Sequence, residues 1–90
     1  MDSELMRLRG EIDRVDEEIL TLFAERMRLV GEIGARKDAG GLPLRDEARE
    51  RALLDRLSAS AGDEMSPYVS ELYERILALS RAYQEELLKR

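Results

Sequence analysis

The chain has 90 residues, with 15 Lys and Arg against 20 Asp and Glu, and it contains no Cys or His. The net charge of -5 argues against nucleic acid or an anionic membrane surface as the main partner. Disulfides, thiolate metal sites and a histidine base are excluded, so we expect neither a metal site nor histidine-based chemistry. Without a signal-like N-terminus or about 18 consecutive apolar residues, the sequence predicts a single cytoplasmic domain over residues 1–90.

The first predicted element is a long helix that begins after Ser3, a candidate N-cap, and continues to about Asp38, before the glycine and proline of residues 39–43. Its apolar residues recur three or four positions apart: Leu5, Leu8, Ile12, Val15, Ile19, Leu22, Phe23, Val30 and Ile33. Such a helix is roughly 50 Å long. A compact chain of this length has a radius of gyration of only about 12 Å. Half of the helix would therefore project with its apolar stripe uncovered, and a second copy is the simplest cover.

Two shorter helices follow. One is predicted from about Asp46 to Ser58, with Leu53, Leu54 and Leu57 on its buried face, and residues 60–64 read as a loop. The last is predicted to begin at Ser66, an N-cap followed by Pro67 at the first helical position. Its apolar face is formed by Val69, Leu72, Tyr73, Ile76, Tyr83 and Leu87. The expected fold class is therefore all-α, with three helices per chain.

Eight polar residues fall inside or beside these apolar faces when the helices are laid out at 100° per residue. They are Arg9 (at the flank), Arg26 and Lys37 on the first helix, Asp46, Arg49 and Glu50 on or before the second, and Ser80 and Gln84 on the third. An unpaired buried charge is costly, so these groups need partners. Four cations face two carboxylates, and a small dianionic ligand would supply the missing negative charge.

A purely structural explanation stands beside this one. A single cation on an apolar stripe commonly extends its charged end to water or joins an ion pair between subunits. Ser80 could satisfy a helix carbonyl, and Gln84 could set the register of a helix interface. The pattern alone leaves both a ligand site and a plain helical dimerisation domain open.

Several segments resemble the helical (AroQ-type) chorismate mutases. They are residues 8–13 (LRGEID), Asp16, residues 19–20 and 24–26 (AER), residues 33–37 (IGARK), residues 43–46 (PLRD) and 48–51 (ARER), and Ser80-x-x-x-Gln84. The resemblance extends from Leu5 to about Glu85, and the order and spacing of the segments are specific. It implies an intertwined helical homodimer in which Arg9 enters the site of the partner chain and the other seven polar residues stay in their own site.

The resemblance also implies an activity, the Claisen rearrangement of chorismate to prephenate in phenylalanine and tyrosine biosynthesis. Conformational restriction and electrostatic stabilisation would supply the rate without a cofactor. Lys37 and Gln84 would donate to the ether oxygen, Arg26 would hold a carboxylate, and Glu50 would accept from the ring hydroxyl. Arg9, Asp46, Arg49 and Ser80 would complete the substrate site. Two alternatives are an isochorismate-pyruvate lyase and a regulatory module that docks on another aromatic-pathway enzyme.

Overall fold

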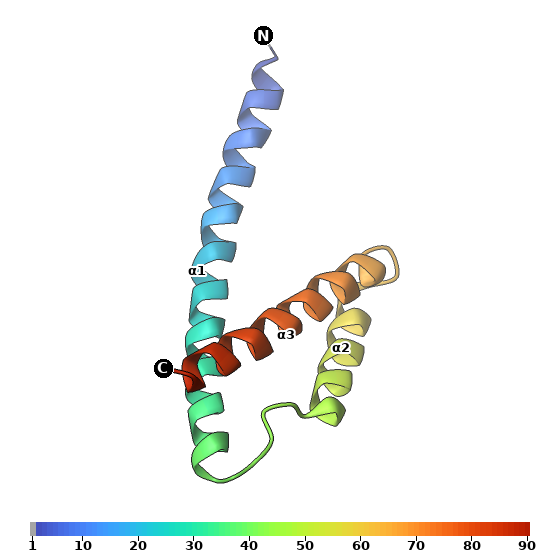
Figure 1. Ribbon diagram of the computed structural model, residues 1–90. Helices are drawn as coiled ribbons and strands as arrows, with labels where there is room; N and C mark the ends of the chain where they lie inside the picture. The colour runs from blue at the N-terminus through green and yellow to red at the C-terminus, as the bar shows by residue number, and fades with distance from the viewer. Residues whose placement is uncertain (1) are drawn as a thin grey trace.

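The computed structural model describes residues 2–90 as three helices, α1 (Ser3–Ala39), α2 (Glu47–Ala61) and α3 (Ser66–Leu88) (Figure 1). No strand occurs in this range, so the expected all-helical class is confirmed. The second helix extends three residues beyond the predicted end at Ser58, into the segment that was expected to be a loop. It stops at Gly62, whose φ of 82° lies in the left-handed region that favours glycine. None of the helices in residues 2–90 has the length and apolar character needed to cross a membrane.

The predicted N-cap of α1 is wrong by one residue. Asp2, rather than Ser3, holds the capping position, and its carboxylate accepts hydrogen bonds from the backbone N–H groups of Glu4 (3.0 Å) and Leu5 (3.1 Å). A charged carboxylate is a stronger acceptor than a hydroxyl and also interacts favourably with the positive end of the helix dipole. Ser3 therefore becomes the first helical residue.

The predicted N-cap of α3 is also wrong. Ser66 is the first residue of α3, and Met65 precedes it without a capping hydrogen bond from its side chain. The backbone N–H of Ser66 donates to Gly62 O at 2.9 Å, so the turn after α2 leads directly into the helix. Because Ser66 already has a hydrogen-bonded helical backbone, its hydroxyl cannot take the cap position.

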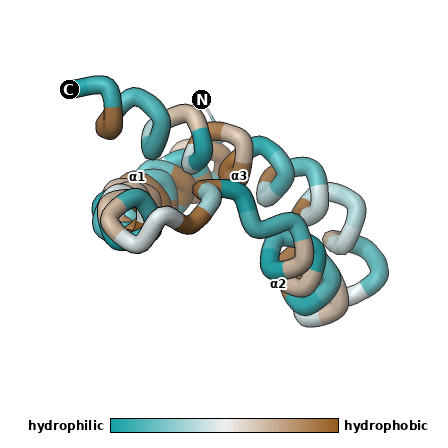
Figure 2. The backbone as a smooth tube through the Cα atoms, turned by 60° about the horizontal axis from the view of Figure 1, so that its bottom comes forward, coloured by the Kyte–Doolittle hydropathy of each residue, from teal (hydrophilic) through white to brown (hydrophobic). Residues whose placement is uncertain are grey.

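The third helix lies across the other two and holds them together. It packs against both α1 and α2, whereas α1 and α2 do not approach each other closely within the described part of the chain (Figures 1 and 2). The crossing with α1 is close because two glycines occupy it. A Cβ atom on Gly31 would lie 3.0 Å from Leu87 Cδ1, and one on Gly34 would lie 3.0 Å from Gln84 Cγ. The result is a flat molecule with extents of 58 × 32 × 14 Å.

The N-terminal half of α1 projects away from the rest of the chain, as the sequence predicted (Figure 1). The radius of gyration is 16.8 Å, compared with about 12 Å for a compact chain of this length. Leu77, at 8% exposed, is the only buried hydrophobic residue in the range 2–90, while Ile12 and Leu22 on the stripe of α1 are 58% and 67% exposed. This chain alone therefore leaves a long apolar surface in contact with water.

Candidate active site

A cavity of about 130 Å³ lies where the three helices and the loop before α2 meet. Seven of the eight polar residues singled out in the sequence line it: Arg26, Lys37, Asp46, Arg49, Glu50, Ser80 and Gln84. Arg9 is the exception. It is exposed on the projecting half of α1, about 25 Å along the helix axis from Arg26 at the usual rise per residue. Arg9 therefore cannot reach the cavity of its own chain.

Two cations on α1 are held at the cavity by neutral oxygens. Arg26 Nη1 donates to Ser80 Oγ at 2.8 Å, and the Ser80 hydroxyl donates in turn to Ile76 O at 2.7 Å. Lys37 Nζ donates to the carbonyl oxygen of Leu44 at 3.0 Å. Neither cation forms an ion pair with a carboxylate among residues 2–90, so their positive charge stays available to an anion.

Gln84 is buried against α1, with an exposed fraction of 6%. Its side-chain Nε2 donates to Val30 O at 2.8 Å. A primary amide carries two N–H groups, so one donor remains for the cavity that Gln84 lines. The absence of a side chain at Gly34 makes this position possible, because a Cβ atom there would press on Cβ and Cγ of Gln84.

The start of α2 fixes the other wall of the cavity. Asp46 is the N-cap of α2 and accepts a hydrogen bond from the backbone N–H of Arg49 at 3.0 Å. This cap sets where the helix begins, and hence where the side chains of Arg49 and Glu50 point. Glu50 is partly buried, and its Oε1 accepts from Arg81 Nη1 at 2.6 Å.

Arg81 is a charged residue of this cavity that the sequence analysis did not single out. A signal was present in the spacing. Arg81 is four residues after the buried Leu77 and three before Gln84, so it shares their face of α3.

The lining is strongly cationic for an acidic protein. Arg26, Lys37, Arg49 and Arg81 face the carboxylates of Asp46 and Glu50, an excess of two positive charges in a chain of net charge -5. Charge in a partly dry cavity acts more strongly than on the open surface. The cavity can hold a small dianion through its arginines and stabilise an oxygen that gains negative charge through Lys37 and Gln84.

The fold and the cavity together define an all-helical domain with a cationic cavity where its helices meet. The chain belongs to the chorismate mutase type II family, which it matches over residues 8–85, and it is a chorismate mutase domain.

Relatives of known name agree with this assignment. The chain is 37% identical over 91 residues to the bifunctional chorismate mutase/prephenate dehydratase of Enterobacter agglomerans. The match covers 99% of this chain and 24% of the relative. It is 34% identical over 84 residues to the T-protein of Haemophilus influenzae, with 91% of this chain and 22% of the relative covered. The chain thus spans about a quarter of the length of these curated relatives.

A solved structure shares both the fold and the length. Chorismate mutase (form II) from Thermus thermophilus superposes with a TM-score of 0.87 at 38% identity, and the match covers 92% of this chain and 96% of that one. The three-helix arrangement is therefore shared with a chorismate mutase chain of nearly the same extent.

Proposed function

We propose that this domain acts as a homodimer that rearranges chorismate to prephenate in phenylalanine and tyrosine biosynthesis. The observation that carries the proposal is the pair Arg26 and Lys37, which neutral oxygens hold at the cavity without a carboxylate partner. The reaction is unimolecular: an ether C–O bond breaks while a C–C bond forms. It needs no nucleophile, so catalysis can come from holding the reactive conformer and from stabilising charge on the ether oxygen.

The arginines account for the two carboxylates of chorismate. Ser80 orients the guanidinium of Arg26, and a guanidinium held in this way can grip a carboxylate with two parallel hydrogen bonds. Arg49 borders the same cavity. The hydroxyl hydrogen of Ser80, now donated to Ile76 O, reaches a substrate carboxylate after rotation about the Cβ–Oγ bond. These contacts would freeze the flexible enolpyruvyl arm over the ring.

Lys37 and Gln84 account for the ether oxygen. The ammonium of Lys37 has three donors and uses one on Leu44 O, and the amide of Gln84 has one N–H left beside Val30 O. The hydrogen bonds from both groups strengthen as negative charge develops on the oxygen. They therefore stabilise the transition state more than the ground state. Glu50, with Asp46 nearby, would accept from the ring hydroxyl.

The geometry of α1 supports a dimer that brings Arg9 into the partner's site. The midpoint of Ser3–Ala39 is Thr21, with Arg9 twelve residues before it and Ile33 twelve residues after it. If two α1 helices pair antiparallel about a two-fold axis at Thr21, the partner's Arg9 lies level with Ile33, between Arg26 and Lys37 along the helix. The same pairing would cover the exposed apolar stripe.

The wider setting is also part of the proposal. Residues 1–90 would form one catalytic domain in the cytoplasm. Because the E. agglomerans relative joins a chorismate mutase to a prephenate dehydratase, this domain would work fused to, or docked on, another enzyme of aromatic biosynthesis.

The activity is tested by the loss of chorismate absorbance with purified protein, followed by acid conversion of prephenate to phenylpyruvate. We expect chorismate to be consumed and its product to yield phenylpyruvate after acid treatment. A parallel reaction with isochorismate distinguishes the mutase from an isochorismate-pyruvate lyase. Release of pyruvate from isochorismate, with chorismate left unchanged, would identify the lyase and contradict the proposed activity.

A further inference from the structure

The ion pair between Arg81 and Glu50 is the most protected one in residues 2–90, and the mechanism above gives Arg81 no role. The two side chains are 28% and 18% exposed. The pair joins α2 to α3, residues 31 positions apart, whereas the pairs on α1 each stay within one or two turns of that helix. Arg81 also lines the cavity beside Ser80 and Gln84.

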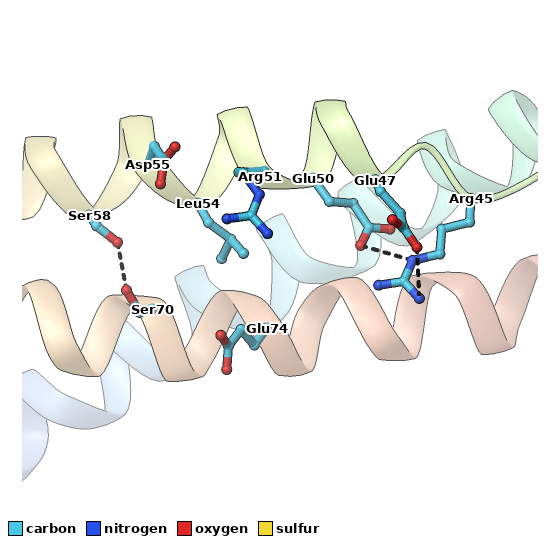
Figure 3. A pocket seen from close by; sticks show the side chains of 9 residues that line it. All are labelled: Arg45, Glu47, Glu50, Arg51, Leu54, Asp55, Ser58, Ser70 and Glu74. Atoms are coloured by element: carbon cyan, nitrogen blue, oxygen red, sulfur yellow. Dashed lines mark hydrogen bonds and ion pairs between the residues drawn. The ribbon is translucent and has the colours of Figure 1, made fainter.

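Glu50 stands between two cavities. It lines the candidate site, and it also lines a second cavity of about 400 Å³ between α2 and α3 (Figure 3). On the second side, Arg45 Nε lies 3.7 Å from Glu50 Oε1, which is too far for a hydrogen bond. The 2.6 Å contact with Arg81 is therefore the one close constraint on this carboxylate among the described residues.

Both cations approach the same oxygen, Oε1. The other oxygen, Oε2, accepts no hydrogen bond from residues 2–90 and remains available as an acceptor. If Arg81 were removed, only the loose contact with Arg45 would hold the carboxylate. A partly buried carboxylate without a close partner is costly, so Glu50 would be drawn toward other cations. Besides Arg45, the cations that line the two cavities of Glu50 include those of the candidate site, which the substrate needs.

We propose that Arg81 is a positioning residue: it anchors Glu50 Oε1, presents Oε2 to a hydroxyl of the substrate and keeps Glu50 from neutralising the cations of the site. The inference rests on the proposed function, since the hydroxyl belongs to the substrate of that site. Arg81 acts on the reaction through Glu50.

A double-mutant cycle with Arg81→Met, Glu50→Gln and the combined variant tests this. The readouts are kcat/KM for chorismate and the Kd of a bicyclic dianionic ether that mimics the transition state. Arg81→Met should weaken both by about ten- to a hundredfold, as expected when a contact group is misplaced. In the Glu50→Gln background the same change should cost less than about twofold, because no carboxylate is left to position. Equal losses in both backgrounds would overturn the inference.

Controls separate folding from positioning. Arg56→Met removes an exposed arginine of α2 that lines none of the cavities described, and it should change neither readout. Circular dichroism and mass in solution check each variant, and Arg81→Gln replaces Arg81→Met if the latter does not fold. If Arg81 and Glu50 are coupled in binding of the mimic but chorismate is not turned over, the inference is supported and the proposed activity is contradicted. Turnover without coupling would do the reverse, and a wild-type protein that neither binds nor reacts would overturn both.

Discussion

The two halves of α1 have the same apolar spacing and different surroundings. In the C-terminal half, α3 crosses the helix, and Arg26 and Lys37 donate to neutral oxygens. In the N-terminal half, Arg7 and Arg14 pair with glutamates of the same helix in full contact with water. Surface ion pairs of this kind stabilise little. A cation held by neutral acceptors beside a cavity, by contrast, keeps its charge for a ligand. Arg28, on the exposed side of the C-terminal half, also pairs with glutamates of its own helix, so neutral partners distinguish the cavity side of that half.

The largest effect is expected from a charge on the uncovered stripe. Ile12→Asp places a carboxylate where the second copy should bury an apolar side chain. Burying that charge costs more binding free energy than truncating most interface residues does. The mass in solution should fall from twice 10.3 kDa to 10.3 kDa, and turnover should be lost. Glu17→Gln, on the opposite face of α1, should leave both unchanged. A dimeric Ile12→Asp would show that this stripe does not form the interface.

The next effect concerns the C-terminal half. Lys37→Ala should lower kcat by about 10²- to 10³-fold, the usual loss when a donor to a developing oxyanion is removed. The melting temperature should change little, because Lys37 is only partly buried and bonds one loop carbonyl. Lys89→Ala, an exposed lysine beyond α3, serves as the control. A folded Lys37→Ala with full activity would remove Lys37 from the mechanism.

Gln84→Glu should confine activity to acidic pH. A carboxyl group donates a hydrogen bond only while protonated, and once ionised it would also face Val30 O, the acceptor that Gln84 now satisfies. The measurement is kcat/KM against pH, with the neighbouring exposed Glu85→Gln as control. Unchanged activity at alkaline pH would show that Gln84 does not donate to the ether oxygen.

The smallest effect lies in the ion pairs of the N-terminal half. The hydrogen bond from Arg7 lowers the pKa of Glu4 below its ordinary value. A depressed carboxyl pKa contributes stability above the pKa of the unfolded state and loses it as the pH falls through the folded-state pKa. Because Glu4 is fully exposed, the contribution should be slight and screened by salt. NMR titration of Glu4 at low and high salt checks this; an ordinary pKa at low salt would mean that the pair does not persist.

The helices and most of the cavity could be predicted because both depend on local spacing. The apolar period of 3.6 residues fixed the faces, and seven polar residues that interrupted those faces line one cavity. The first helix cap could not be predicted from spacing, since Asp2 and Ser3 are adjacent residues that can both cap a helix and differ in acceptor strength and charge. Arg81 could have been found from its spacing to Gln84, which places both on one face of α3. Its contact with Glu50 could not, because Glu50 is on another helix and no local pattern reports such a contact.

The central claim is that each site needs two chains, and a complementation experiment tests it most directly. Arg9→Ala and Lys37→Ala dimers should each be nearly inactive. After mixing and subunit exchange, half of the dimers would be hybrids with one intact site of two, so activity should rise to about a quarter of the wild-type value. If the mixture stays as inactive as its parts although hybrids form, Arg9 does not serve the partner's site and the account is contradicted.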